Sequence, residues 1–125
     1  MYKKLFFVLI TVFFCSQVYA ADATLGEQIY NKSCKTCHNP NTAPLMKSPV
    51  VHDVAAWKLR FKAAEEIAKN NPEKYKSAMD VLVATVKGGK GAMPAGGMCM
   101  NASSNNKKCS DAEYVAAIKF MSEKK

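Results

Sequence analysis

The stretch Cys34-Lys35-Thr36-Cys37-His38 decides how the rest of this chain is interpreted. Its two cysteines are three residues apart, and a histidine directly follows the second one. On a helix this spacing is about one turn, so both sulfurs can reach the two vinyl groups at one edge of a porphyrin. The imidazole of His38 can then ligate the iron. The stretch therefore predicts one covalently attached haem c, bound by Cys34 and Cys37, with iron ligated by His38.

Three other chemistries use two nearby cysteines, and each makes its own demand on the sequence. A thioredoxin-like redox pair needs a preceding strand, and no strand pattern precedes Cys34. A structural zinc site would combine Cys34, Cys37 and His38 with one further cysteine. A simple disulfide between Cys34 and Cys37 would close an unusually tight loop. A thiol–disulfide or zinc module is thus the alternative to haem, and it would be colourless.

The N-terminus has the pattern of a secretory signal peptide. Lys3 and Lys4 precede an apolar run from Leu5 to Phe14, and small residues lead to Ala20. The run is short for a membrane span, although retention as an anchor is the alternative reading. We expect cleavage after Ala20, so that residues 1–20 are the signal peptide and residues 21–125 form a single exported, periplasmic domain. In an oxidising compartment Cys99 and Cys109 are expected to form a disulfide.

Apolar spacing of three and four residues predicts an all-α domain without strands. The expected helices cover residues 24–33, 53–70, 72–87 and 110–122, and the expected loops cover residues 39–51 and 88–109. Asn71 and Pro72 are the predicted cap and first residue of the third helix. Gly26 lies inside the first helix, where it is either a close helix–helix contact or a tolerated glycine. Ser110 and Glu113 have the spacing of a capping box.

The sixth ligand of a haem iron has several candidates. Met79 and Met121 match the apolar faces of helices, which favours a place in the core. Met46 is too close to the haem motif to reach the opposite ring face with ease, and Met98 and Met100 flank Cys99. Met93 is followed by Pro94 and preceded by glycines, which permit a close backbone approach to a flat ring. We predict Met93 as the ligand, with His52 as the outside candidate.

The chain carries a formal net charge of +8, and its lysines include several on the outer faces of the expected helices. These residues are Lys58, Lys62, Lys69, Lys74 and Lys76. A solvated helix face explains them, and so does a docking surface for an acidic redox partner, where charge would raise the encounter rate. The lysine-ended tail is too short for a nucleic-acid-binding arm, so no nucleic acid is expected, and any membrane contact would be peripheral.

Taken together, these motifs resemble the class I c-type cytochromes. The haem motif lies near the mature N-terminus, a Pro-Leu pair follows, and a glycine-rich Met-Pro loop precedes a C-terminal helix. Gly-Lys-Gly-Ala-Met-Pro, then Gly-Gly, a cysteine pair and a Ser-Asp-x-Glu helix start, is more narrowly similar to the bacterial cytochrome c5 type. The resemblance covers nearly all of residues 24–122. The segment between Arg60 and Lys87 is longer than expected for the cytochrome c5 type.

The resemblance implies a small cytochrome c fold, with N- and C-terminal helices packed around one haem. It implies thioethers at Cys34 and Cys37 and axial ligation by His38 and Met93. It also implies a hydrogen bond from His38 to the Pro44 carbonyl. Gly26 and Tyr30 would meet the face from Tyr114 to Met121. In the stretch from Ala55 to Arg60, Trp57 and Arg60 would lie near the haem propionates, and Arg60 would pair with one of them.

The function that follows from these expectations is one-electron transfer between redox proteins of a respiratory chain, without enzymatic chemistry on a substrate. The alternative within haem chemistry is a ligand-binding or peroxidase-like protein whose iron lacks Met93 and keeps an open sixth site.

Overall fold

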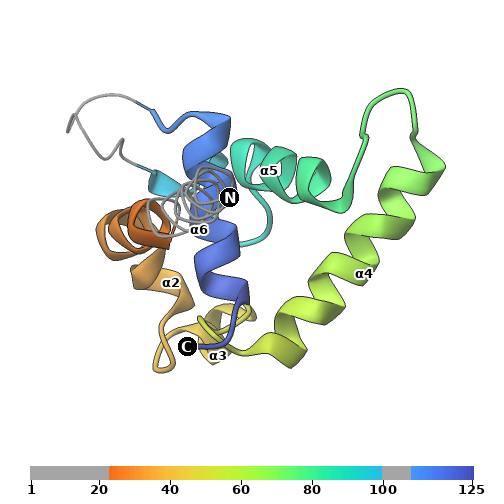
Figure 1. The fold of residues 1–125 in the computed structure, drawn as a ribbon. Coiled ribbons are helices and arrows are strands. Elements are labelled where there is room, and N and C mark those ends of the chain that lie inside the picture. The colour runs from red at the N-terminus through yellow and green to blue at the C-terminus, as the bar shows by residue number, and fades with distance from the viewer. Residues whose placement is uncertain (1–22, 100–107) are drawn as a thin grey trace, which may run out of the picture.

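The computed structural model describes residues 23–99 and 108–125, and the regular structure of this part is entirely helical (Figure 1). The predicted signal peptide and Met100 lie outside these residues. After a helical segment at residues 23–29, the elements are η1 (Tyr30–Cys34), α2 (Lys35–His38), α3 (Ala43–Met46), α4 (Val54–Asn70), α5 (Ala78–Gly88), η2 (Ala95–Met98) and α6 (Asp111–Ser122). The expected all-α class is confirmed. None of the described helices has the length and apolar character needed to cross a membrane.

The haem motif is carried by one continuous helical segment that runs from residue 23 to residue 38. The helix predicted for residues 24–33 is therefore longer than expected. No breaker occurs before Asn39, whose backbone is extended with ψ of 159°. The stretch η1 is π-helical, and the Lys35 N–H bonds to the Tyr30 carbonyl. Such π-turns are rare and often accompany functional sites. Here the turn ends at Cys34, the first residue of the motif, and the other four residues follow in α2.

Helix α4 begins where the sequence predicts. The side chain of Asp53 accepts a hydrogen bond of 3.1 Å from the Ala56 N–H, which satisfies one of the unpaired donors at the helix start. Trp57 and Ala64, seven residues apart, are buried on its inner face. In Figure 1 this helix leads away from the rest of the fold, and α5 returns along it.

Helix α5 starts at Ala78 and not at residue 72, so the predicted start is wrong by six residues. Ser77 is the N-cap, and it forms a reciprocal capping box with Asp80. The Asp80 carboxylate also accepts from the Lys76 N–H at 2.9 Å. Residues 71–75 instead form a turn in which the Asn71 carbonyl accepts from Tyr75. The capping box supplies more partners for the helix start than Asn71 does, and it sets the boundary.

The N-terminal helical segment crosses α6 in close contact, as expected. A Cβ atom at Gly26 would lie 2.8 Å from the Cβ of Phe120 and still closer to the Ala116 carbonyl oxygen. One turn further on, the rings of Tyr30 and Phe120 are 5.4 Å apart. This crossing is the centre of the core, whose buried members are Ile29, Tyr30, Trp57, Val83, Cys109, Tyr114, Ala117, Ile118 and Met121.

We expect Gly26→Ala to lower the free energy of unfolding by about 1–3 kcal/mol, because the added methyl group meets backbone that cannot easily move. Denaturant unfolding of the variant and the parent protein measures this. Gly88→Ala is the matched control, since no heavy atom lies within 4 Å of a Cβ at that position. It should leave stability unchanged or raise it by up to about 1 kcal/mol. Equal effects at the two glycines would contradict the close crossing.

Candidate functional site

Cys34 and Cys37 carry free, half-buried thiols on consecutive turns of the N-terminal helical segment. Cys34 packs against the core cluster. Burial and the neighbouring Cys37 raise the pKa of Cys34 to about 11. The Cys34 thiol therefore stays protonated at neutral pH. Thiol–disulfide exchange needs a thiolate of lowered pKa, so this environment does not suit the redox-pair alternative.

His38 is held in one orientation by the loop that follows it. Its Nδ1 lies 2.8 Å from the carbonyl oxygen of Pro49. A carbonyl only accepts, so Nδ1 carries the proton and donates, and Nε2 keeps its lone pair. Burial lowers the pKa of His38, the Pro49 bond opposes this, and the positive Arg60 lowers it further. The result is a neutral imidazole with a free Nε2, which is the form that ligates a metal ion.

The predicted hydrogen bond from His38 to the Pro44 carbonyl is wrong. Pro44 lies within the short helix α3, where its carbonyl faces the Lys47 N–H. The chain then continues without regular secondary structure through residues 48–50 and brings Pro49 back to His38. A backbone carbonyl leaves no signature in the sequence, and Pro44 was only what the family resemblance implied.

Trp57 stacks on His38, and Arg60 lies one turn further along α4, whereas their expected place near the haem propionates stays a prediction. The rings of His38 and Trp57 are stacked, with centroids 5.8 Å apart and planes 26° apart. The Trp57 Nε1–H donates to the Val50 carbonyl at 2.9 Å, and Arg60 Nη2 donates to the Lys47 carbonyl at 3.0 Å. A hollow of about 360 Å³ lies between the loop and α4, and it is lined by Ser48, Pro49, Ala56, Leu59, Arg60 and Ala63.

Met93 is half-buried on a separate segment, at the end of a tight turn after α5. Its N–H donates to the Lys90 carbonyl at 3.0 Å, and its carbonyl accepts from the Lys90 N–H at 2.9 Å. Gly89 makes the turn possible, because its φ is +79° and a Cβ there would lie 2.8 Å from the Ala95 nitrogen. In the described residues no hydrogen bond or ring contact joins Met93 to His38.

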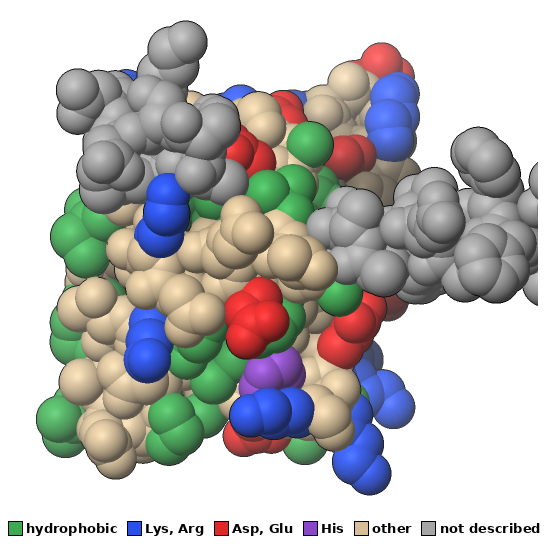
Figure 2. Space-filling model, turned by 60° about the vertical axis from the view of Figure 1, so that its left-hand side comes forward, with side chains coloured by type: hydrophobic (Ala, Val, Ile, Leu, Met, Phe, Trp, Pro, Cys, Tyr) green, Lys and Arg blue, Asp and Glu red, His purple; other side chains and the backbone are tan. Residues whose placement is uncertain are grey.

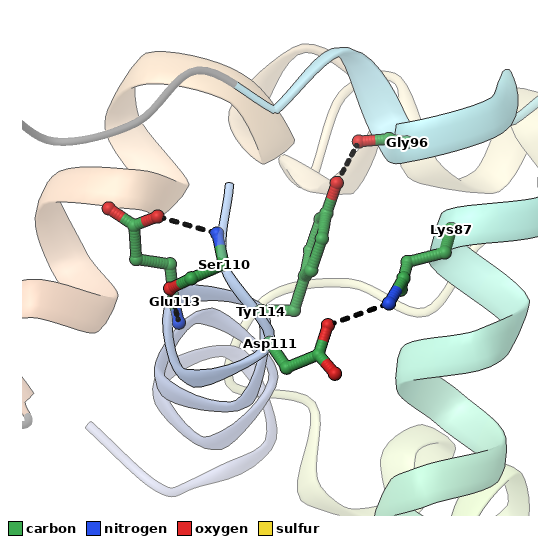
Figure 3. A network of polar contacts seen from close by, with 6 residues as sticks. All are labelled: Lys87, Gly96, Ser110, Asp111, Glu113 and Tyr114. Carbon is green, nitrogen blue, oxygen red and sulfur yellow. Dashed lines mark hydrogen bonds and ion pairs between the residues drawn. The ribbon is translucent and has the colours of Figure 1, made fainter. Parts of the chain in front are cut away.

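Both sides of the Met93 turn are fastened to α6 (Figure 3). The Tyr114 hydroxyl donates to the Gly96 carbonyl at 3.1 Å. Lys87, in the last turn of α5, pairs with Asp111 at 2.8 Å. This pair is exposed and so contributes little to stability. The predicted capping box of Ser110 and Glu113 is confirmed and fixes the start of α6.

The predicted disulfide between Cys99 and Cys109 is confirmed, with a Cα–Cα distance of 5.7 Å. It ties the end of the Met93 segment to the residue before the N-cap of α6. In the chain-entropy model a crosslink over so short a loop stabilises the fold by about 2–3 kcal/mol. It also removes both cysteines as a fourth ligand for the zinc alternative. Within residues 23–99 and 108–125, no three His, Cys, Asp or Glu side chains group as a metal site.

The other candidate ligands have different surroundings. His52 holds the C-terminal end of α6, since its Nδ1 lies 2.8 Å from the Glu123 carbonyl and its ring meets Phe120 edge-on. Met121 is buried and Met79 packs against the core, as predicted. Met46 and Met98 are exposed. Among the methionines outside the core that the structure describes, Met93 is thus the one that is both half-buried and held in a fixed turn.

The residues present suit a covalently attached haem. Two free thiols one turn apart provide the atoms for thioethers, and the adjacent imidazole offers Nε2 with its tautomer already set. A thioether sulfur is available on a second, fixed segment at Met93. Together with the absence of any strand among the described residues, this donor set defines a c-type haem protein of the all-α kind.

Comparison with known proteins agrees with that class. Residues 21–121 match the family model described as cytochrome C oxidase, cbb3-type, subunit III. The chain is 35% identical to cytochrome c5 of Azotobacter vinelandii over 100 residues, which cover 80% of this chain and 94% of that protein. It is 33% identical to cytochrome c-555 of Chlorobaculum tepidum, over 82% of this chain and 77% of the relative. Cytochrome c6 of Cyanidioschyzon merolae is 32% identical to the chain, over 76% of this chain and 77% of the relative.

The chain therefore belongs to the class I c-type cytochromes. It carries covalently bound haem c and transfers electrons through it. Sequence reasoning identified the haem motif, the methionine turn and the disulfide. It missed Pro49 and the Tyr114–Gly96 bond, because both depend on backbone carbonyls.

Proposed function

We propose that this cytochrome is a periplasmic carrier, exported by residues 1–20, that passes single electrons between proteins of a respiratory chain. It performs no reaction on a substrate of its own. The observation that carries the proposal is the neutral His38 imidazole, fixed by Pro49 and adjacent to the two free thiols. When bound, the haem iron supplies a centre that takes up and releases one electron.

In this proposal Cys34 and Cys37 would attach the ring through thioethers, and His38 and Met93 would ligate the iron. His38 would act through Nε2, because Nδ1 is occupied by Pro49. Met93 would act through Sδ, from a turn restrained by α5 on one side and α6 on the other. Two ligands on restrained segments favour electron transfer, since little rearranges when the charge changes. A methionine ligand also raises the reduction potential.

Arg60 is proposed to pair with a haem propionate. Its guanidinium has five N–H donors, and the Lys47 carbonyl takes one of them, so donors remain for a carboxylate. Trp57 has only one donor, and this donor already bonds to Val50. Trp57 would therefore contribute its ring to the haem surroundings, and its N–H would not reach a propionate.

The acidic-partner docking surface is proposed for the outer face of α4 and the turn that follows it. Its five lysines, Lys58, Lys62, Lys69, Lys74 and Lys76, are all exposed. Lys69 is paired with Glu66 at 3.1 Å, so Lys58 and Lys62 carry the main part of the proposal. On the face seen in Figure 2, basic side chains are spread over the surface, and several gather at the lower right beside a histidine.

Stopped-flow electron exchange with an acidic redox protein tests this function. We expect a second-order rate that falls as ionic strength rises, because opposite charges steer the encounter. Lys58→Gln with Lys62→Gln should slow exchange several-fold at low salt. Lys124→Gln with Lys125→Gln removes the same charge at the tail and serves as the control. A rate independent of salt, or equal slowing by both pairs of changes, would refute docking through α4.

A further inference from the structure

The loop segment of residues 47–51 contacts the haem motif through three hydrogen bonds. The Ser48 hydroxyl donates to the Cys37 carbonyl at 2.6 Å. The Pro49 carbonyl accepts from His38 Nδ1 at 2.8 Å. The Val51 N–H donates to the His38 carbonyl, also at 2.8 Å. His38 is therefore bonded to this segment through both its side chain and its backbone.

The same segment contacts α4 through the carbonyls of Lys47 and Val50, which lie on either side of Pro49 in the sequence. The Lys47 carbonyl accepts from Arg60, and the Val50 carbonyl accepts from the Trp57 indole N–H. Trp57 and Arg60 are three residues apart on α4, so they lie on one face, a single turn apart. Lys47 and Val50 thus bond to α4, whereas Ser48, Pro49 and Val51 bond to the haem motif.

The first residue of the segment, Lys47, has a backbone conformation that depends on support from its surroundings. Lys47 has φ of +53°, in the left-handed region that a residue with a side chain adopts only where its surroundings determine it. Its N–H bonds back into α3, and its carbonyl is the one that Arg60 binds. The position of the Pro49 carbonyl therefore depends on α4 as well as on the loop.

We propose that Trp57 and Arg60 are positioning residues for His38. By fixing the two carbonyls around Pro49, they hold the acceptor that sets the tautomer and the direction of the imidazole. This inference rests on the proposed role of His38 as an iron ligand. It gives Trp57 a function that its indole N–H performs on the protein itself and not on the haem.

A firm hydrogen bond at Nδ1 makes an imidazole a stronger ligand. A stronger donor favours the ferric ion, so loosening the Pro49 carbonyl should raise the reduction potential. It should also let the Nδ1 proton exchange faster with solvent. The Trp57 bond is part-buried and the Arg60 bond is exposed to competing water, so Trp57 should have the larger effect.

Trp57→Phe is the decisive variant, because it keeps an aromatic ring next to His38 and removes the N–H donor to Val50, together with one ring of the buried indole. In the reduced haem protein we expect the His38 Nδ1 proton to exchange about three- to tenfold faster by NMR, the factor for losing one typical hydrogen bond. We also expect a higher reduction potential by voltammetry. Unchanged exchange and unchanged potential would overturn the inference.

Arg60→Gln provides the second test, and it decides the matter if Trp57→Phe does not fold. Arg60→Gln removes a positive charge as well as a hydrogen-bond donor, so its reduction potential would reflect both changes. Proton exchange at His38 is therefore the measurement for this variant. Lys62→Gln removes the same charge from α4, at a residue outside the 47–51 contacts, and is the matched control. Faster exchange in Arg60→Gln alone supports the inference, and equal exchange in both variants contradicts it.

Failure of the proposed function is distinguishable from failure of this inference. If the parent protein shows no upfield-shifted His38 ring protons in the reduced state, His38 is not an iron ligand and the function proposed above fails. If those protons are shifted and the variants behave like the parent, only the positioning role of Trp57 and Arg60 fails.

Discussion

Met93→Ala is expected to lower the reduction potential by on the order of 0.1 V or more, within the roughly 0.8 V range over which axial ligands set haem potentials. The reason is that a thioether ligand favours ferrous iron, and alanine has no donor atom to replace it. The sixth site should then be open, so carbon monoxide should bind the reduced variant rapidly while the parent protein binds it slowly or not at all. Voltammetry and the visible spectrum under carbon monoxide measure both effects.

Met98→Ala is the matched control for this change. Met98 lies five residues further along the same segment and is exposed, so its loss should leave the potential and the spectrum as they are. Rapid carbon monoxide binding by the parent protein would contradict Met93 ligation and favour the open-site haem protein. An unchanged potential in Met93→Ala would do the same.

Cys34→Ala with Cys37→Ala is expected to abolish covalent haem retention. Each thiol supplies one thioether, so removing both leaves the ring held by iron ligands and packing alone. After acid–organic extraction the variant polypeptide should be colourless, while each single variant should keep colour through its remaining thioether. The double variant should also be less stable, because Cys34 packs against the core.

The control for the cysteine change is Cys99→Ser with Cys109→Ser. This pair removes two cysteines that are bonded to each other and not placed in the haem motif. It should lose about 2–3 kcal/mol of stability in the chain-entropy model and keep its haem through extraction. Loss of covalent haem in this control, or retention in the Cys34 and Cys37 double variant, would refute the assignment of the thioethers.

The parts of the fold that the sequence predicted are those determined by side chains acting locally. The capping residues Asp53 and Ser110 marked helix starts that the structure confirms. For Gly26 the sequence left open a close helix crossing or a tolerated glycine, and the structure shows the close crossing, where an added Cβ would meet Ala116. The start of α5 was missed because two capping signals compete there, and Ser77 with Asp80 satisfies more backbone groups than Asn71 does.

The parts of the site that the sequence did not predict depend on backbone groups brought together by the fold. His38 bonds to a carbonyl eleven residues away, and every residue of the loop has a backbone carbonyl that could accept this bond. Pro44 was the wrong choice because α3 uses its carbonyl locally. The resemblance implies that Trp57 and Arg60 lie near the haem propionates, which stays a prediction, and their bonds to the Val50 and Lys47 carbonyls could come only from the structure.

The most direct measurement is the visible spectrum of the exported protein in the reduced state, taken before and after acid–organic extraction. We predict a low-spin haem spectrum before extraction and haem absorbance that stays with the polypeptide afterwards. A protein that is colourless when made in a host competent for haem attachment, or one whose haem is extracted completely, would contradict covalent haem at Cys34 and Cys37.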